Sequence, residues 1–267
     1  MSRSNPTESA AHPSKRWTEY NGEFGTFRFY DKEAIKEDGS KGDNVDLGAK
    51  LTFLYLDTTY TVTGWSEANG CGIYSTEVKD ISNGILTVKP FKGNVDPKVG
   101  TWNTIKESVK AMGGKFTANI YIAFKGKSGR LEIGVLQLKG AAYAAWNDFT
   151  KSKGKSLYEG AVSVVGHKDG KKGRVEFKTP MFGMIAVSEA SNAEALELDK
   201  ELQAYLKGKI AEAPVAATPA QASTPSQAPK EDYSDQEMFG ETVPPRTGIP
   251  APSIDDEPFD EDLDLPF

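Results

Sequence analysis

Hydrophobic and polar residues alternate with period two over much of the chain, and this pattern is typical of β-strands. An Asn83-Gly84 pair predicts a tight turn, and 168–173 is expected to form the loop of a late hairpin. The alternation predicts strands over 24–30, 50–64, 72–79, 85–89, 115–125, 130–138, 161–166 and 174–182.

Three other segments follow a helical period. The segment 102–112 spaces its apolar residues at i, i+4 and i+7 and ends at paired glycines, which predicts a short helix. A second helix is expected over 141–153. Ser191 and Glu194 have the spacing of a capping box, which predicts the start of a third helix. That helix would carry Leu198, Leu202 and Leu206.

The order of these elements suggests a fold. Between residues 50 and 138, three strands, a short helix and two strands follow one another, as in an OB-fold. We therefore expect a mainly β protein, an elaborated OB-fold-type β-barrel with two or three helices. This domain would span 16–211, after a disordered N-terminus over 1–15.

Charge divides the chain into two unequal parts. The 267 residues carry a net charge of −6, but residues 212–267 hold 13 acidic and 2 basic side chains, a net charge of −11. Residues 1–211 therefore carry +5. A basic body with an acidic tail indicates either interaction with a polyanion or a tail that mimics one.

The composition of the tail changes along its length. Residues 212–253 are rich in Ala, Pro, Ser and Thr, which predicts a flexible linker that buries too little apolar surface to fold. Residues 254–267 are acidic but also apolar, with a terminal phenylalanine. A partner pocket lined by Arg or Lys would accept such a ring and its carboxylate, so we expect a protein-interaction tip. The alternative is an ordinary acidic, disordered end.

The sequence offers little catalytic chemistry. It contains no P-loop, GxGxxG, HExxH or GxSxG motif. Cys71 is the only cysteine, which excludes an internal disulfide, and His12 and His167 are the only histidines. We expect no enzyme activity, no metal and no cofactor. A polar start and the lack of an apolar span of about 20 residues predict a soluble cytoplasmic protein and no membrane partner.

Aromatic and basic residues are interleaved in the body. Single-stranded nucleic acid needs cations for its phosphates and aromatic faces for its splayed bases. Alternation over 115–125 directs Lys115, Tyr121 and Lys125 outward, whereas Phe116 faces the core. The alternative is that the aromatics pack internally and the lysines are a solvated surface. The candidate contacts are Arg28, Trp65, Tyr74, Lys89, Phe91, Lys92, Lys115, Tyr121, Lys125, Lys127 and Arg130.

The end of the tail resembles that of single-stranded DNA-binding proteins of bacteria and bacteriophages. Those proteins close in a short acidic peptide with Pro and Phe. The matching residues are Asp260, Glu261, Asp262, Asp264, Leu265, Pro266 and Phe267. In the body, 62–65, 115–121 and 138–141 resemble phage-encoded replication proteins with an elaborated OB-fold.

The resemblance implies a role without catalysis. The protein would coat single-stranded DNA regardless of sequence and recruit replication, recombination or repair proteins through its tail, in the host-cell cytoplasm if it is phage-encoded. The sequence leaves open whether it acts alone, as a homodimer or as a larger oligomer. One alternative is an acidic-tailed interaction adaptor or DNA mimic. Another is an RNA-binding or strand-annealing protein.

Overall fold

The structure is a computed structural model, and it describes residues 11–36 and 39–211. The predicted linker and acidic tip therefore lie outside the described residues, as do 1–10. The strands are β1 (Arg16–Asn21), β2 (Thr26–Ile35), β3 (Lys41–Gly48), β4 (Thr52–Ser66), β5 (Cys71–Ser75), β6 (Leu86–Pro90), β7 (Lys98–Gly100), β8 (Gly114–Lys125), β9 (Leu131–Leu138), β10 (Ala161–Lys172) and β11 (Val175–Ile185). The helices are α1 (Trp102–Ala111), α2 (Gly140–Lys153) and α3 (Glu189–Ala211), with short 3-10 turns η1 (Glu67–Asn69) and η2 (Gly154–Tyr158).

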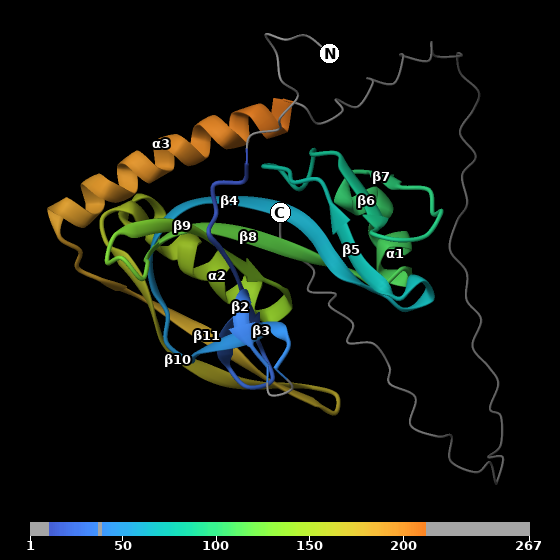
Figure 1. The fold of residues 1–267 in the computed structure, drawn as a ribbon, viewed down its shortest axis with the longest axis horizontal. Coiled ribbons are helices and arrows are strands. Elements are labelled where there is room, and N and C mark those ends of the chain that lie inside the picture. Colours follow the sequence, from blue (N-terminus) through green and yellow to red (C-terminus); the bar gives the residue numbers. More distant parts are fainter. Residues whose placement is uncertain (1–10, 37–38, 212–267) are drawn as a thin grey trace, which may run out of the picture. The chain divides into compact units, whose positions relative to one another are not determined.

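The strands form one mixed sheet in the order β3-β2-β1-β9-β8-β4-β5-β6-β7, and β10 joins it by pairing with β4 and β11 (Figure 1). Neighbours are antiparallel except β1 and β9, which are parallel. The mainly β class that the sequence predicted is confirmed. The pairings of the described strands leave the sheet unclosed, so the predicted closed barrel is not confirmed.

The two faces of β4, β8 and β9 bury separate cores. On one face, Phe116, Ile120 and Ile122 join a cluster that includes Trp146 of α2. On the other face, Tyr121 and Val135 join a smaller cluster under α3. Alternate residues of a strand point to opposite faces, so a strand covered on both sides has no solvated face. This is why β8 is buried almost throughout.

The first two helices agree with their sequence patterns. In α1, Trp102, Ile105 and Val109 are buried along one side. The helix gives way to a glycine pair in which Gly113 has a φ of 93°, the left-handed region that favours glycine. In α2 the most deeply buried side chain is Trp146. None of the helices within the described ranges is long and apolar enough to cross a membrane.

The third helix begins earlier than the capping box predicted. It starts at Glu189, and the Ser188 hydroxyl accepts a hydrogen bond from the Ser191 backbone N–H at 3.2 Å. The Glu194 carboxylate instead accepts one from the Leu131 N–H at 3.1 Å. The predicted leucine spacing is confirmed: Leu202 and Leu206 are buried and Leu198 packs beside them.

The late hairpin also differs from its prediction. The segment 168–173 was expected to be a loop, but β10 continues to Lys172, and only two residues, Gly173 and Arg174, form the turn. Opposite charges face each other across this extension. Lys171 pairs with Glu176 at 3.0 Å, and Lys178 pairs with Asp169 at 3.6 Å. Cross-strand ion pairs of this kind favour strand pairing in a hydrophilic sequence.

Candidate nucleic-acid interface

Three aromatic side chains gather where β4, β5 and β6 lie side by side. We call Trp65, Tyr74 and Phe91 the aromatic patch. Trp65 is 54% exposed and Phe91 is 69% exposed. The rings of Tyr74 and Phe91 stack with centroids 4.4 Å apart and planes 28° apart. Large exposed rings that gather in one place leave flat apolar faces available to a ligand.

The local sequence explains why these rings share one face. Along β5, Cys71 and Ile73 point into the core, so Gly72 and Tyr74 point the other way. Trp65 lies directly opposite Gly72 in the β4–β5 pairing, and the Phe91 N–H donates to the Gly72 carbonyl at 2.9 Å. A Cβ on Gly72 would lie 3.3 Å from the Phe91 ring. The missing side chain therefore lets the ring lie close to the strand.

Basic side chains border the aromatic patch. Lys89 lies directly opposite Tyr74, with its Nζ 5.6 Å from the centre of the tyrosine ring, within cation–π range. Lys92 is exposed on the loop after β6. Its backbone N–H donates to the buried Cys71 sulfur at 3.3 Å, so the only cysteine anchors this loop. Lys115 is exposed on β8 and pairs with Thr63 of β4, two residues from Trp65.

Further along the same face, a polar network replaces the exposed rings. The Glu77 carboxylate accepts three hydrogen bonds, from the Thr59 hydroxyl at 2.7 Å, the Asn119 amide at 2.9 Å and the Tyr121 hydroxyl at 2.8 Å. Gln137 extends the network by donating to the Asn119 carbonyl oxygen at 3.0 Å. We call these five residues the Glu77 network. Its buried polar groups are satisfied internally, and its acid disfavours a nearby phosphate.

His12 and α3 cover the far end of this network. The His12 ring lies 4.9 Å from Trp17, 5.9 Å from Tyr121 and 4.9 Å from Tyr205 of α3, measured between ring centres. Burial, opposed in part by Glu77, lowers the pKa of His12. Burial also raises the pKa of Tyr121, and Glu77 raises it further. The tyrosine therefore stays protonated and serves as a donor to Glu77.

Tyr121 corrects a prediction. Alternation placed it on the outward face of 115–125, as a residue that could stack on a base, but its side chain is 0% exposed. The alternation itself is sound, because Lys115 and Tyr121 do share a face. That face is covered at the Tyr121 end by His12 and α3. A period-two pattern identifies the face but does not reveal a remote segment that packs over it.

The structure separates the other candidates. Arg28 lies between two acidic neighbours, opposite Glu19 and Asp46, and forms a 3.5 Å ion pair with Glu19. Its charge is therefore partly compensated. Lys125, Lys127 and Arg130 are exposed, but they lie where β8 turns into β9, at the end of β8 away from Lys115. The structure thus gathers Trp65, Tyr74, Lys89, Phe91, Lys92 and Lys115, and leaves Arg28, Lys125, Lys127 and Arg130 elsewhere.

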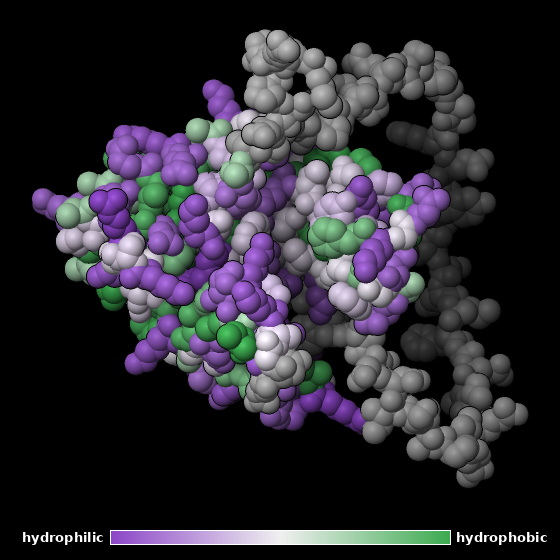
Figure 2. All heavy atoms as spheres, viewed as in Figure 1, coloured by the Kyte–Doolittle hydropathy of each residue, from purple (hydrophilic) through white to green (hydrophobic). Residues whose placement is uncertain are grey.

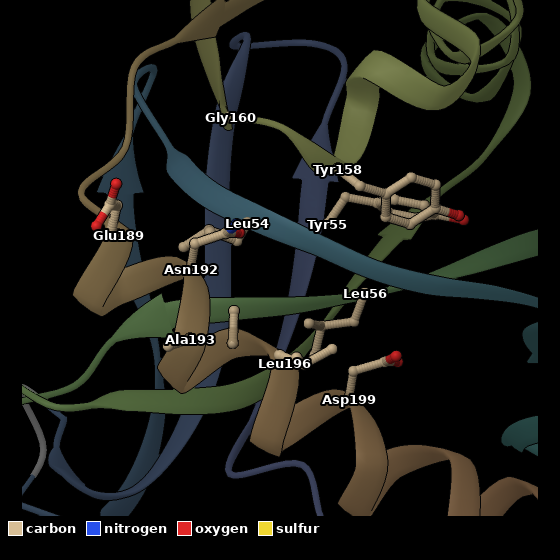
Figure 3. A pocket seen from close by; sticks show the side chains of 11 residues that line it. Leu54, Tyr55, Leu56, Tyr158, Gly160, Glu189, Asn192, Ala193, Leu196 and Asp199 are labelled. Atoms are coloured by element: carbon tan, nitrogen blue, oxygen red, sulfur yellow. The ribbon is translucent and has the colours of Figure 1, made fainter.

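The sequence patterns did not indicate the Glu77 network or a pocket of about 370 Å³ between β4 and α3. Figure 3 shows the rings of Tyr55 and Tyr158 next to each other in this pocket. The centres of the two rings are 5.4 Å apart. Glu189 and Asp199 of α3 also line it. Among the residues that line the pocket, only Glu189 and Asp199 carry a charge that the sequence makes visible. Their negative charge would repel a polyanionic ligand. Within the described ranges, no group of three or more metal-ligating side chains is present.

The face seen in Figure 2 is mostly hydrophilic where the described residues are drawn, with smaller hydrophobic areas among them.

Comparison with known proteins found no matching family model, curated protein or solved structure. Any proposal for function therefore rests on the chemistry of this chain's own residues.

Proposed function

We propose that this protein binds single-stranded DNA without sequence preference. The observation that carries the proposal is the aromatic patch, in which the stacked Tyr74 and Phe91 rings and the exposed Trp65 lie beside Lys89. Bases stack on such rings whatever their identity, at about 1–3 kcal/mol each. Lys92 and Lys115 supply further cations for the phosphates on either side.

The strand order supports an elaborated OB-fold as the scaffold. The five strands β9-β8-β4-β5-β6 are neighbours in that order, and α1 lies in the chain between β6 and β8. An OB-fold uses a sequence of three strands, helix and two strands, and this chain adds the short strand β7 between β6 and α1. In this chain β9 pairs with β1 rather than with β6. We propose that β1, β2 and β3 elaborate the fold at that point.

We also propose that the body of the chain and the acidic tip, residues 254–267, have separate roles. The tip would recruit replication or recombination proteins, while the body binds DNA. Deleting 255–267 should leave affinity for oligo(dT) unchanged or tighter, because the deletion removes negative charge from the chain. The measurement is an anisotropy titration of the full and shortened chains. Loss of DNA binding on deletion would contradict this division.

The main test is a titration of the full chain with labelled oligo(dT) of increasing length, at low and high salt. We expect binding whose log affinity falls by about 0.7 per log unit of salt for each phosphate contact. Trp65→Ala combined with Phe91→Ala should weaken binding about tenfold or more. Tyr158→Ala is the matched control, because Tyr158 is 56% exposed but lies outside the aromatic patch.

Tryptophan emission gives a second measurement. Trp65 is the most exposed of the four tryptophans, whereas Trp102 and Trp146 are buried. Oligo(dT) should quench the emission, and Trp65→Phe should remove most of the quenching while keeping a stacking ring. Competition with matched RNA separates DNA from RNA preference, and a strand-pairing assay tests annealing. Absence of oligo(dT) binding at low salt would overturn the proposal.

A further inference from the structure

The pocket between β4 and the first half of α3 lies at the opposite end of β4 from Trp65. Its volume of about 370 Å³ falls within the usual range of small-molecule sites, about 300–1,000 Å³. At Leu54 and Tyr55, β4 pairs with β8 alone among the described strands, so its other edge is open there. The pocket therefore lies outside the aromatic patch, at a stretch of sheet edge that no second strand of the described chain covers.

Apolar and aromatic side chains form much of the lining. Leu54 and Leu56 come from β4, and Leu196 comes from α3. Leu196 is 56% exposed, so the helix presents an apolar side chain to solvent at this site. The Tyr55 and Tyr158 rings complete this lining, and the face of a tyrosine ring attracts a cation. The middle of the pocket thus suits an apolar chain that also carries positive charge.

The two charged residues of the lining are both acidic. Figure 3 shows Glu189 and Asp199 at opposite ends of the lining stretch of α3. They are ten residues apart in the helix, roughly 15 Å along its axis. Asp199 accepts a hydrogen bond from the Gln203 amide at 3.0 Å, but neither acid forms an ion pair with another residue of 11–36 or 39–211. Lys79 reaches the Asp199 end only through Gln203 and Asp57, and it is already paired with Asp57.

We propose that this pocket binds a linear aliphatic polyamine. A terminal ammonium would lie at each carboxylate, where charge-assisted hydrogen bonds are stronger than neutral ones. The methylene chain would lie along the leucines, and the inner ammonium groups would lie against the tyrosine rings. Extended spermine is long enough to reach from Glu189 to Asp199. The volume favours such a molecule over a peptide with two basic residues at the same spacing.

The test is isothermal titration of the full chain with spermine, without nucleic acid, in about 0.15 M salt to screen weak contacts with exposed acids. Glu189→Gln/Asp199→Asn should weaken spermine binding about tenfold or more. Glu197→Gln/Glu201→Gln is the matched control, because it removes two negative charges from exposed positions of α3 outside the lining. Its affinity for spermine should stay within about twofold of the wild type.

Two diamines test whether the ligand spans both carboxylates. 1,12-Diaminododecane has the length of spermine, whereas putrescine carries the same two charges on a much shorter chain. The long diamine should bind the wild type at least about fivefold more tightly, because it engages both acids at once. Leu196→Arg places a cation in the pocket at a position that is already 56% exposed, and it should abolish spermine binding.

Several results would overturn the proposal. These are an equal loss of spermine affinity in the Glu197→Gln/Glu201→Gln control, equal affinities for the two diamines, or unchanged spermine binding by Leu196→Arg. Binding of a peptide with arginines four positions apart, without binding of spermine, would also overturn it, since the pocket would then be a protein contact. Matching circular dichroism spectra of all chains establish that the variants fold.

Discussion

The two ends of one face of the β4–β8 pair behave in opposite ways. At one end Trp65 and Lys115 are exposed beside the aromatic patch. At the other end Tyr121 is fully buried and hydrogen-bonded to Glu77. The strands have the same alternation at both ends. The difference arises because His12 and α3 pack over the Tyr121 end only. The same alternation therefore produces a solvent-exposed site at the Trp65 end and a buried polar network at the Tyr121 end.

The largest expected effect lies in stability at the covered end. Tyr121→Ala removes a buried ring and its hydrogen bond to Glu77, so the free energy of unfolding should fall by about 3–5 kcal/mol. Trp65→Ala, at the exposed end, should change it by about 0.5 kcal/mol or less. Urea unfolding followed by circular dichroism measures both. Equal losses in the two variants would contradict the comparison.

The next effect concerns the acid at the centre of the network. Glu77→Ala leaves Thr59, Asn119 and Tyr121 without their shared acceptor, which should cost about 2–3 kcal/mol of unfolding free energy. Glu67→Ala removes the same charge from an exposed residue of η1 and is the control. If both variants lost equal stability, the network would not be the cause.

A smaller effect should appear in binding. Lys115 and Lys125 stand at opposite ends of β8, and both are exposed. Lys115→Gln should weaken a short oligo(dT) about threefold, by removing one phosphate contact beside the aromatic patch. Lys125→Gln should leave that affinity unchanged. Anisotropy titrations at one salt concentration compare the two, and a larger loss in Lys125→Gln would move the interface to the other end of the strand.

The smallest effect concerns His12 and pH. Because burial lowers its pKa, the folded chain takes up the proton at lower pH than the unfolded chain. The unfolded state therefore binds more protons just below about pH 6.5, and stability falls as the pH drops through that range. The stability gap between wild type and His12→Gln should shrink from pH 7.5 to pH 5 in urea unfolding. A stability gap that stays constant or widens as the pH falls would contradict this assignment to His12.

Local patterns predicted local structure well. The periodic apolar residues of 102–112 and the leucines of α3 appear as predicted, because a helix face depends on spacing within one segment. The capping box predicted from Ser191 and Glu194 was wrong. The Ser188 hydroxyl accepts the hydrogen bond from the Ser191 N–H, and the Glu194 carboxylate accepts one from Leu131 of β9. The loop predicted over 168–173 also failed, because ion pairs between the strands extend the pairing.

The sequence by itself determined the mainly β class, the division between a basic body and an acidic tail, and the residues that share each face of a strand. Only the tertiary structure decided that β1 pairs with β9, that Glu77 reaches three donors from two strands, and that Tyr121 is covered while Trp65 is not. The physical reason is how far apart in the sequence the interacting residues lie. Spacing along one segment fixes its own periodicity, whereas exposure depends on contacts with residues such as His12, 109 positions away from Tyr121.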